Sequence, residues 1–166
     1  MTNPTEQLGG KFLLYIMTAG TVGGTGPDTP VFTKVAGQRK GSFGRTGDVI
    51  KAQHKDSFPW YRVVRGFIQW TFDFDGVWIT DDSTGAMDPS LVALQDAFEE
   101  SGSYDNDEGQ IYVQIVTPKY GEPAGTGSTY TGWAIISDFS LDGPHDNLIT
   151  YTGKLTGNGA YDYVAI

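Results

Sequence analysis

Apolar and polar side chains alternate strictly along residues 67–75, and this pattern constrains the fold more than any other feature of the chain. One set of alternate positions carries Ile68, Trp70, Phe72 and Phe74, and the other carries Gln69, Thr71, Asp73 and Asp75. A period of two is typical of a β-strand with one buried face and one solvent face. The Asp75-Gly76 pair predicts a tight turn, after which residues 77–80 return as the next strand.

Further short runs rich in large apolar residues, separated by glycine and proline, predict about eight strands in all. The other strands are expected at residues 11–18, 31–35, 109–117, 133–141 and 148–156. The alternation in 133–141 predicts a buried face made of Trp133, Ile135, Phe139 and Leu141. Asn158-Gly159 is expected to end the last strand. The glycine-rich and basic residues 37–54 predict a long open hairpin, or an exposed loop with strand-like flanks.

One helix is predicted after Asp88, which is a suitable N-cap, with Pro89 at the first helical position. Leu91, Leu94 and Phe98 then recur at helical spacing, so the helix has one apolar face and must lie against a sheet. The chain is therefore predicted to be all-β: a β-sandwich or partly closed barrel with one flanking α-helix. Residues 1–166 are expected to form a single domain, with 1–10 as a flexible N-terminal arm.

Charge is divided sharply along the chain, whose formal net charge is −9. Residues 34–65 hold eight lysines and arginines against two aspartates, whereas residues 66–118 hold eleven acidic residues and no basic one. Oppositely charged patches that point in different directions favour contact between copies of one chain, which propagates into rings or filaments. The alternative is that both are solvated faces that partly neutralise each other within the fold. The candidate contact residues are Arg39, Lys40, Arg45, Lys51 and Lys55 on the basic side, and Asp73, Asp75, Asp81 and Asp82 on the acidic side.

Residues suited to catalysis or metal binding are scarce. The chain has no cysteine and only two histidines, His54 and His145, and it carries no recognisable nucleophile or zinc-binding motif. Asp73 and Asp75 are spaced as a carboxylate pair, but such a pair is commonly the polar side of a sheet. The acidic turn at 105–109 departs from a calcium-binding loop in its glycine and its last ligand. We therefore expect no enzyme activity, no cofactor and no metal.

Two binding functions are weighed as alternatives. Aromatic residues among the basic ones, Phe43, Phe58, Trp60 and Tyr61, suit stacking on nucleic-acid bases. However, residues outside 34–65 carry the difference between −9 and +6, a net charge of −15, which would repel that ligand. The main alternative is a carbohydrate-binding β-sandwich module, which requires aromatic side chains gathered on one solvent face. Trp70 and Trp133 are instead predicted to be buried. No apolar run is long enough to span a membrane, and we expect the chain to be made in a cytoplasm.

An ordered set of segments extends from about residue 11 to residue 160. It consists of residues 11–17, 35–39, 55–57 with Trp60, 66–70 leading into Asp75-Gly76, 94–98, 133–141 with 144–146, and 155–159. In this set and order the sequence resembles the major tail tube proteins of phages with long non-contractile tails, and the related tail proteins of gene transfer agents. The helix between an Asp-Gly hairpin and a late Ser-x-Phe-Ser-Leu strand carries most of the resemblance.

The resemblance implies a structural virion protein that is assembled in the host cytoplasm and located in the tail. In that family six copies of a β-sandwich form a ring, their inner sheets join into one barrel, and a long hairpin reaches the adjacent ring. By position, residues 37–56 correspond to that hairpin, and Asp73, Asp75, Asp81 and Asp82 are candidates for the lumen or for assembly. The implied partners are other copies in stacked hexameric rings, a tape-measure protein, and tail terminator and tip proteins. DNA crosses the lumen without specific binding, and no membrane is involved.

Overall fold

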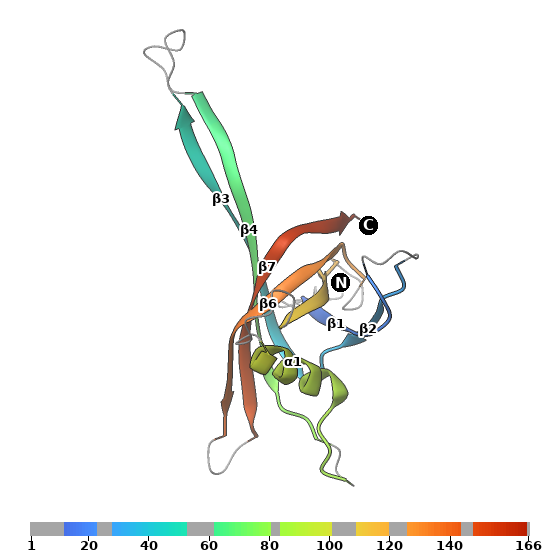
Figure 1. Cartoon of the computed structure of the whole chain (residues 1–166). Helices are drawn as coiled ribbons and strands as arrows, with labels where there is room; N and C mark the ends of the chain where they lie inside the picture. The colour runs from blue at the N-terminus through green and yellow to red at the C-terminus, as the bar shows by residue number, and fades with distance from the viewer. Residues whose placement is uncertain are drawn as a thin grey trace, which may run out of the picture.

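The computed structural model describes residues 12–22, 28–52, 62–80, 84–100, 109–119, 126–143 and 148–165. Its elements in chain order are β1 (Leu13–Ala19), β2 (Val31–Lys34), β3 (Gln38–Ala52), β4 (Arg62–Val77), α1 (Pro89–Glu100), β5 (Gln110–Val116), β6 (Thr129–Asp142) and β7 (Thr150–Val164) (Figure 1). The predicted N-terminal arm at 1–10 and both histidines lie outside the described residues.

All seven strands belong to one antiparallel sheet with the order β2-β1-β5-β6-β7-β4-β3. The sheet is not closed, and β2 and β3 form its two edges. Helix α1 packs on one face, mainly against β6 and β1. The predicted all-β fold with one flanking helix is confirmed, with seven strands in the described residues where about eight were expected.

The two edges of the sheet come close together where the chain passes from β2 to β3. The connection spans only residues 35–37, and Gly37 adopts a φ of +69° that favours glycine. The next side chain, Gln38, reaches β1. Its Oε1 accepts a 2.7 Å hydrogen bond from the N–H of Leu14, and its Nε2 donates a 2.8 Å bond to the Leu14 carbonyl oxygen. One side-chain amide thus takes the place of strand pairing between β1 and β3.

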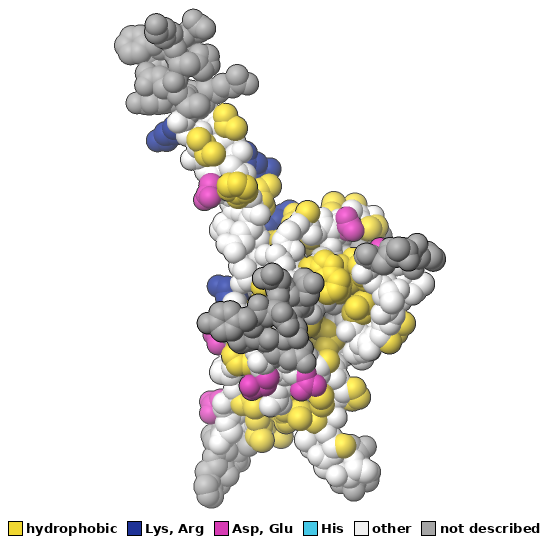
Figure 2. Space-filling model, in the orientation of Figure 1, with side chains coloured by type: hydrophobic (Ala, Val, Ile, Leu, Met, Phe, Trp, Pro, Cys, Tyr) yellow, Lys and Arg dark blue, Asp and Glu magenta, His cyan; other side chains and the backbone are white. Residues whose placement is uncertain are grey.

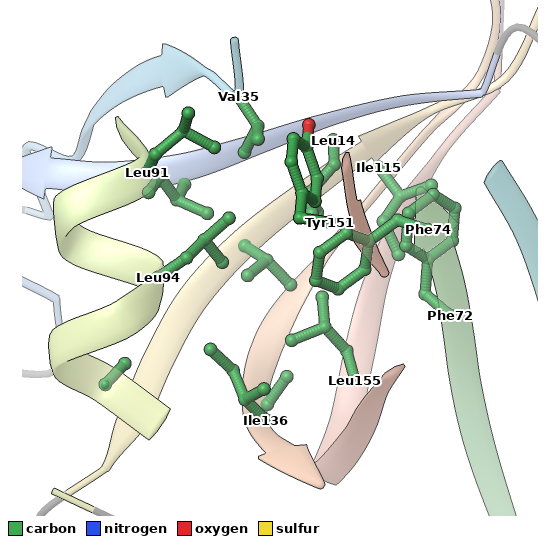
Figure 3. Packing of buried hydrophobic residues seen from close by; sticks show 14 of the residues in the cluster. Leu14, Val35, Phe72, Phe74, Leu91, Leu94, Ile115, Ile136, Tyr151 and Leu155 are labelled. Atoms are coloured by element: carbon green, nitrogen blue, oxygen red, sulfur yellow. The ribbon is translucent and has the colours of Figure 1, made fainter. Parts of the chain in front are cut away.

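Helix α1 and the sheet enclose one hydrophobic core (Figure 3). The helix begins as predicted, because Oδ1 of Asp88 accepts the N–H of Ser90 at 2.9 Å. Leu91 and Leu94 are fully buried, and Figure 3 shows both pointing from the helix toward the sheet. The large side chains that meet them from the sheet include Phe72, Phe74, Ile136, Tyr151 and Leu155. Removing this apolar surface from water is the main force that holds the helix to the sheet.

The predicted turn at Asp75-Gly76 is wrong. β4 continues through both residues, and no separate strand follows it at 77–80. Gly76 is required for space rather than for a turn, since a Cβ there would lie 2.3 Å from the hydroxyl oxygen of Tyr151 and 2.6 Å from the carbonyl oxygen of Gly37. Tyr151 approaches from a distant part of the chain, so the local sequence gives no sign of this constraint.

The predicted buried face of β6 is wrong except at Phe139, and its last member, Leu141, is 48% exposed. Ile135 is exposed and Trp133 is only partly buried, whereas Ile136 is fully buried. The register between β6 and β7 shifts between Ile136 and Asp138. This bulge brings Phe139 to the core side, where it packs against the hydrophobic cluster. The alternation therefore changes phase within the strand.

β7 extends beyond its predicted end at Asn158-Gly159 and runs to Val164. Gly159 has a φ of +91°, which a glycine adopts readily. Gly159 lies in a stretch where β7 advances by four residues, from Gly157 to Tyr161, while its partner β6 advances by only two. The Asn-Gly pair therefore forms a bulge inside the strand, and the predicted end of the strand does not occur here.

Candidate assembly surfaces

β3 and β4 extend beyond the rest of the sheet as a two-stranded ribbon, called the arm here, which comprises residues 46–52 and 62–69 (Figure 1). β7 pairs with β4 only as far as Thr71, whereas β3 pairs with β4 up to Ala52 and Arg62. The hairpin predicted within residues 37–54 is wrong in its extent, because residues 38–52 form a single strand and the second strand of the hairpin is β4. The arm projects from one end of the body, where other molecules can reach it.

Large apolar side chains are exposed on both strands of the arm. They are Val49, Ile50, Val63, Val64, Phe67 and Ile68. Phe67 is 87% exposed, whereas Trp70, three residues later on the same strand, is 2% exposed. Figure 2 shows hydrophobic side chains along the arm interspersed with lysine and arginine. A concentration of exposed apolar surface is typical of an interaction site.

Side chains hold β4 to β7 at the point where the arm leaves the sheet. The indole Nε1 of Trp70 donates a 3.2 Å hydrogen bond to the carbonyl oxygen of Gly159. Gly157 provides the space for the indole, because a Cβ at that position would lie 2.1 Å from the ring. The junction thus depends on one tryptophan and two glycines.

An aromatic cluster surrounds this junction and is covered by Arg45. Its members are Phe43, Trp70, Tyr130, Tyr161 and Tyr163. The guanidinium carbon of Arg45 lies 5.7 Å from the ring centroids of both Phe43 and Tyr130. Nη1 of Arg45 donates a 3.1 Å hydrogen bond to the hydroxyl of Tyr161, and this bond raises the pKa of the guanidinium. Arg45 therefore connects the root of the arm to β6 and β7.

The sheet face opposite α1 is polar across β3, β4, β7 and β6. A shallow hollow of about 700 Å³ on this face is lined by Lys40, Ser42, Asp73, Phe74, Asp75, Asp138, Thr152, Gly153 and Lys154. Lys154 lies in register between Asp73 on β4 and Asp138 on β6. Nη2 of Arg39 lies 3.8 Å from Oδ2 of Asp75. Acidic and basic side chains therefore alternate across the strands of this face, here called the polar face.

Two strand edges border the polar face. β3 pairs only with β4, and beyond Gln38, whose side chain bonds to β1, its other edge carries no strand pairing along its described length. The pairing of β5 with β6 ends at Ile135, and among the described residues β6 beyond that point pairs with β7 alone. Open edges present backbone N–H and C=O groups that another strand can pair with. The polar region thus has an open edge on each side.

The structure places the predicted contact residues in three different settings. Lys40, Asp73 and Asp75 come together on the polar face beside Arg39, Lys51 lies exposed on the arm, and Arg45 turns back on the aromatic cluster. Lys55, Asp81 and Asp82 lie outside the described residues. Their roles in assembly stay predictions.

Sequence reasoning overlooked Gln38 and Phe67. For Phe67 a signal was present, because it falls on the positions of the alternation that Gln69 and Thr71 occupy, where polar residues are expected. Nothing local distinguishes Gln38.

Within the part of the chain that the structure describes, no group of three or more histidine, cysteine or acidic side chains is arranged to hold a metal ion. No helix in those same residues is long and apolar enough to cross a membrane.

Residues 6–163 match the model of a family described as phage tail tube protein. The chain belongs to this family. It is accordingly a structural protein of the virion tail and not an enzyme, as its resemblance to the major tail tube proteins implied. A carbohydrate-binding function is not favoured, and Trp70 is buried as predicted. No curated protein sequence matches this tail tube protein.

Solved structures with the same fold come from phage-like particles. The virion of a native gene transfer agent particle contains a chain with a TM-score of 0.65 and 14% identity, covering 93% of this chain and 96% of that one. The tail of an empty gene transfer agent particle, refined helically with C6 symmetry, gives a TM-score of 0.61 at 18% identity, with the same two coverages. The SPP1 tail tube gives 0.52 at 13% identity, covering 95% of this tail tube protein and 78% of the SPP1 chain.

Proposed function

We propose that six copies of this tail tube protein close into a ring, and that the rings stack into the tube through which DNA leaves the virion. The single observation that carries the proposal is the pair of open strand edges, one on β3 and one on β6, at the two sides of the polar face. The C6 symmetry of the gene transfer agent tail with the same fold supports the number six.

Ring closure is proposed to pair the open edge of β3 with the open part of β6 in the neighbouring copy. Each copy then contributes β6, β7, β4 and β3 in that order to one continuous barrel. The open edge of β3 and the open part of β6 both have a partner when the ring closes, which removes the aggregation hazard that these two edges present. The exposed Arg39 and Lys40 near the start of the β3 edge oppose unspecific pairing in the free chain.

The polar face is proposed to line the lumen. Lys154, between Asp73 and Asp138 in register, cannot present an isolated positive charge to a phosphate backbone. The overall net charge of −9 acts in the same direction. DNA would therefore pass without releasing counterions and without sticking. Asp81 and Asp82 stay lumen or assembly candidates.

The arm is proposed to reach the adjacent ring, with Lys51 and Lys55 among its contacts. Tube ends require further partners, and structures with the same fold include a tube-terminating cap and a baseplate. A tape-measure protein that sets the length of the tube, and tail terminator and tip proteins, complete the proposed set. Residues 1–166 act as one domain in this scheme.

Negative-stain electron microscopy of the purified chain tests the proposal directly. We expect sixfold rings or tubes in both low and moderate salt, whereas a chain that stays monomeric at high concentration in both would overturn it. Charge reversal at Lys51, which is exposed on the arm, should weaken stacking, and unchanged polymerisation would remove Lys51 from the contact.

A further inference from the structure

Phe67 is the side chain whose position the fold explains least. It is 87% exposed, although an aromatic ring of this size gains substantially from burial. Because it contacts so little of its own chain, Phe67 contributes little to the stability of the monomer. We therefore expect Phe67 to be buried in a contact with another molecule.

A β-bulge presents Phe67 at this position. β3 pairs Gly47 with Ile68 and then Val49 with Arg65, so β4 advances by three residues where β3 advances by two. The extra residue belongs to the pair formed by Gly66 and Phe67. A Cβ at Gly66 would lie 3.0 Å from the Cβ of Asp48, so the bulge is tight on that side. Bulges commonly re-aim a side chain, and this one directs the phenyl ring away from the core.

The ring stands beside a hollow at the root of the arm. This hollow has a volume of about 340 Å³ and is lined by Thr46, Asp48, Phe67, Ile68, Gln69, Gly157 and Gly159. Two of the lining residues are glycines, so an approaching side chain would meet little obstruction there. Exposed Val63 and Val64 extend the apolar surface along the same strand toward the tip of the arm.

A second exposed apolar patch lies at the opposite end of the body. It consists of Ile79, Leu141, Leu148 and Ile149, and the N–H of Trp78 fixes it by donating a 2.8 Å hydrogen bond to the carbonyl oxygen of Ile149. Leu148, at 71%, is its most exposed member. The patch lies where the hairpin of β6 and β7 points away from the arm (Figure 1). We call it the lower patch.

Charge around the two apolar patches is complementary. Lys51 and Arg65 are exposed on the arm, and Asp142 is exposed on β6 beside Leu141 of the lower patch. Figure 2 shows basic side chains along the arm, with acidic colour among them, and acidic side chains on the lower half of the body. Opposite charges beside matching apolar patches favour one relative orientation of two copies.

We propose that Phe67 is the anchor of a contact between successive rings, and that it docks on the lower patch of a second copy of this chain. The proposal rests on the ring-and-tube function above and adds the surfaces that meet. The apolar surface around Phe67 and the lower patch differ and lie at opposite ends of the molecule. A contact between them leaves the Phe67 surface of one copy and the lower patch of the other copy free, so it can repeat without limit. Large aromatic residues are commonly the anchors of such interfaces.

The decisive variant is Phe67→Ser, because an exposed side chain can be changed without unfolding the monomer. We expect an unchanged melting temperature, rings that still form, and at least a tenfold rise in the protein concentration needed for tubes. Leu148→Ser on the lower patch should act in the same way. Val31→Ser is the matched control: Val31 is 54% exposed on β2, outside both patches, and the variant should polymerise like the wild type.

Cysteine crosslinking identifies the partner surface, because the natural chain has no cysteine. Phe67→Cys mixed with Leu148→Cys should give oxidised dimers, and a chain carrying both should give a ladder of higher oligomers. Dimers from Phe67→Cys alone would mean that like patches meet, which overturns the proposal. If the wild type forms tubes and the Phe67→Ser variant forms them at the same protein concentration, the docking proposal alone is overturned. If the wild-type chain forms neither rings nor tubes, the proposed function is overturned as well.

Discussion

The side-chain amide of Gln38 pairs with both backbone polar groups of Leu14, through hydrogen bonds of 2.7 and 2.8 Å. Its second N–H donates to the carbonyl oxygen of Val35 at 2.9 Å. Both amide hydrogens and the amide oxygen are thereby engaged. The seam between β1 and β3 is closed by a side chain because the chain turns from β2 into β3 too quickly for a strand to intervene.

Gln38→Met retains most of the side-chain volume and removes the three hydrogen bonds. We expect the free energy of unfolding to fall by about 1–3 kcal/mol, because the N–H of the buried Leu14 is left without a partner. The Leu14 carbonyl oxygen keeps its 3.0 Å hydrogen bond from the N–H of Val35. Urea denaturation measures the change. Gln69→Met, at an exposed residue of the arm, is the control, and an equal effect of both substitutions would contradict the role of Gln38.

Tyr151 connects the stability of the fold to alkaline pH. Its hydroxyl donates a 2.7 Å hydrogen bond to the carbonyl oxygen of Ala36, and burial raises its pKa well above the ordinary value of about 10. The folded state thus holds the proton more tightly than the unfolded state. Its contribution to stability is complete below about pH 10 and is lost as the pH rises further.

Tyr151→Phe should therefore make the alkaline fall in stability shallower, and should lower the free energy of unfolding at pH 7 by about 1 kcal/mol through the lost hydrogen bond. Urea unfolding at a series of pH values from 7 to 11 or so follows both effects. Tyr163→Phe, at an exposed residue, serves as the comparison and should retain the wild-type slope. Identical slopes for wild type and Tyr151→Phe would refute this assignment.

Gly157→Ala should destabilise the junction between β4 and β7, because the new Cβ would lie 2.1 Å from the indole of Trp70. Overpacking of this kind costs about 1–3 kcal/mol. Thermal unfolding reports the change, and Trp70→Phe in the same chain should reduce the added cost of the alanine. Gly47→Ala is the control, since its Cβ would meet nothing nearer than 3.7 Å. Equal costs at the two glycines would argue against the steric explanation.

Arg45→Ala should loosen the root of the arm without unfolding the body. Loss of the two cation–π contacts and the hydrogen bond to Tyr161 removes roughly 1 kcal/mol of local stabilisation, or about a fivefold rise in amide exchange. Hydrogen exchange of peptides that cover residues 43–50 measures this. Arg65→Ala, on the arm beyond the aromatic cluster, should leave these amides unchanged. A uniform rise across the chain would show a global effect instead.

The sequence predicts those parts of the fold that local chemistry determines. Helix α1 was predicted because Asp88, Pro89 and the spacing of Leu91 and Leu94 lie within one short segment. The turn at Asp75-Gly76 was wrong because the reason for the glycine is the ring of Tyr151, which comes from another strand. The phase change in β6 escaped prediction for the same reason, since a bulge is defined by pairing with β7.

The candidate site divides in the same way. Glycines and basic residues indicated an exposed, strand-like stretch at 37–54, but the second strand of the hairpin comes from residues 62–77, which the local pattern did not assign to it. The aromatic cluster draws its rings from β3, β4, β6 and β7, and only the sheet order brings them together. Phe67 falls on the polar positions of the alternation, whereas the bulge opposite Asp48 is defined by the pairing with β3 and could not be predicted from β4 alone.

The arm leaves the body at one end only, and this gives a tube built as proposed a direction. Its first and last rings are chemically unlike, one displaying unoccupied arms and the other uncovered lower patches. Elongation can therefore continue at one extremity while the opposite one is sealed. A protein that seals the end with unoccupied arms must present a surface like the lower patch. A protein that seals the end with uncovered lower patches must present a segment like the arm.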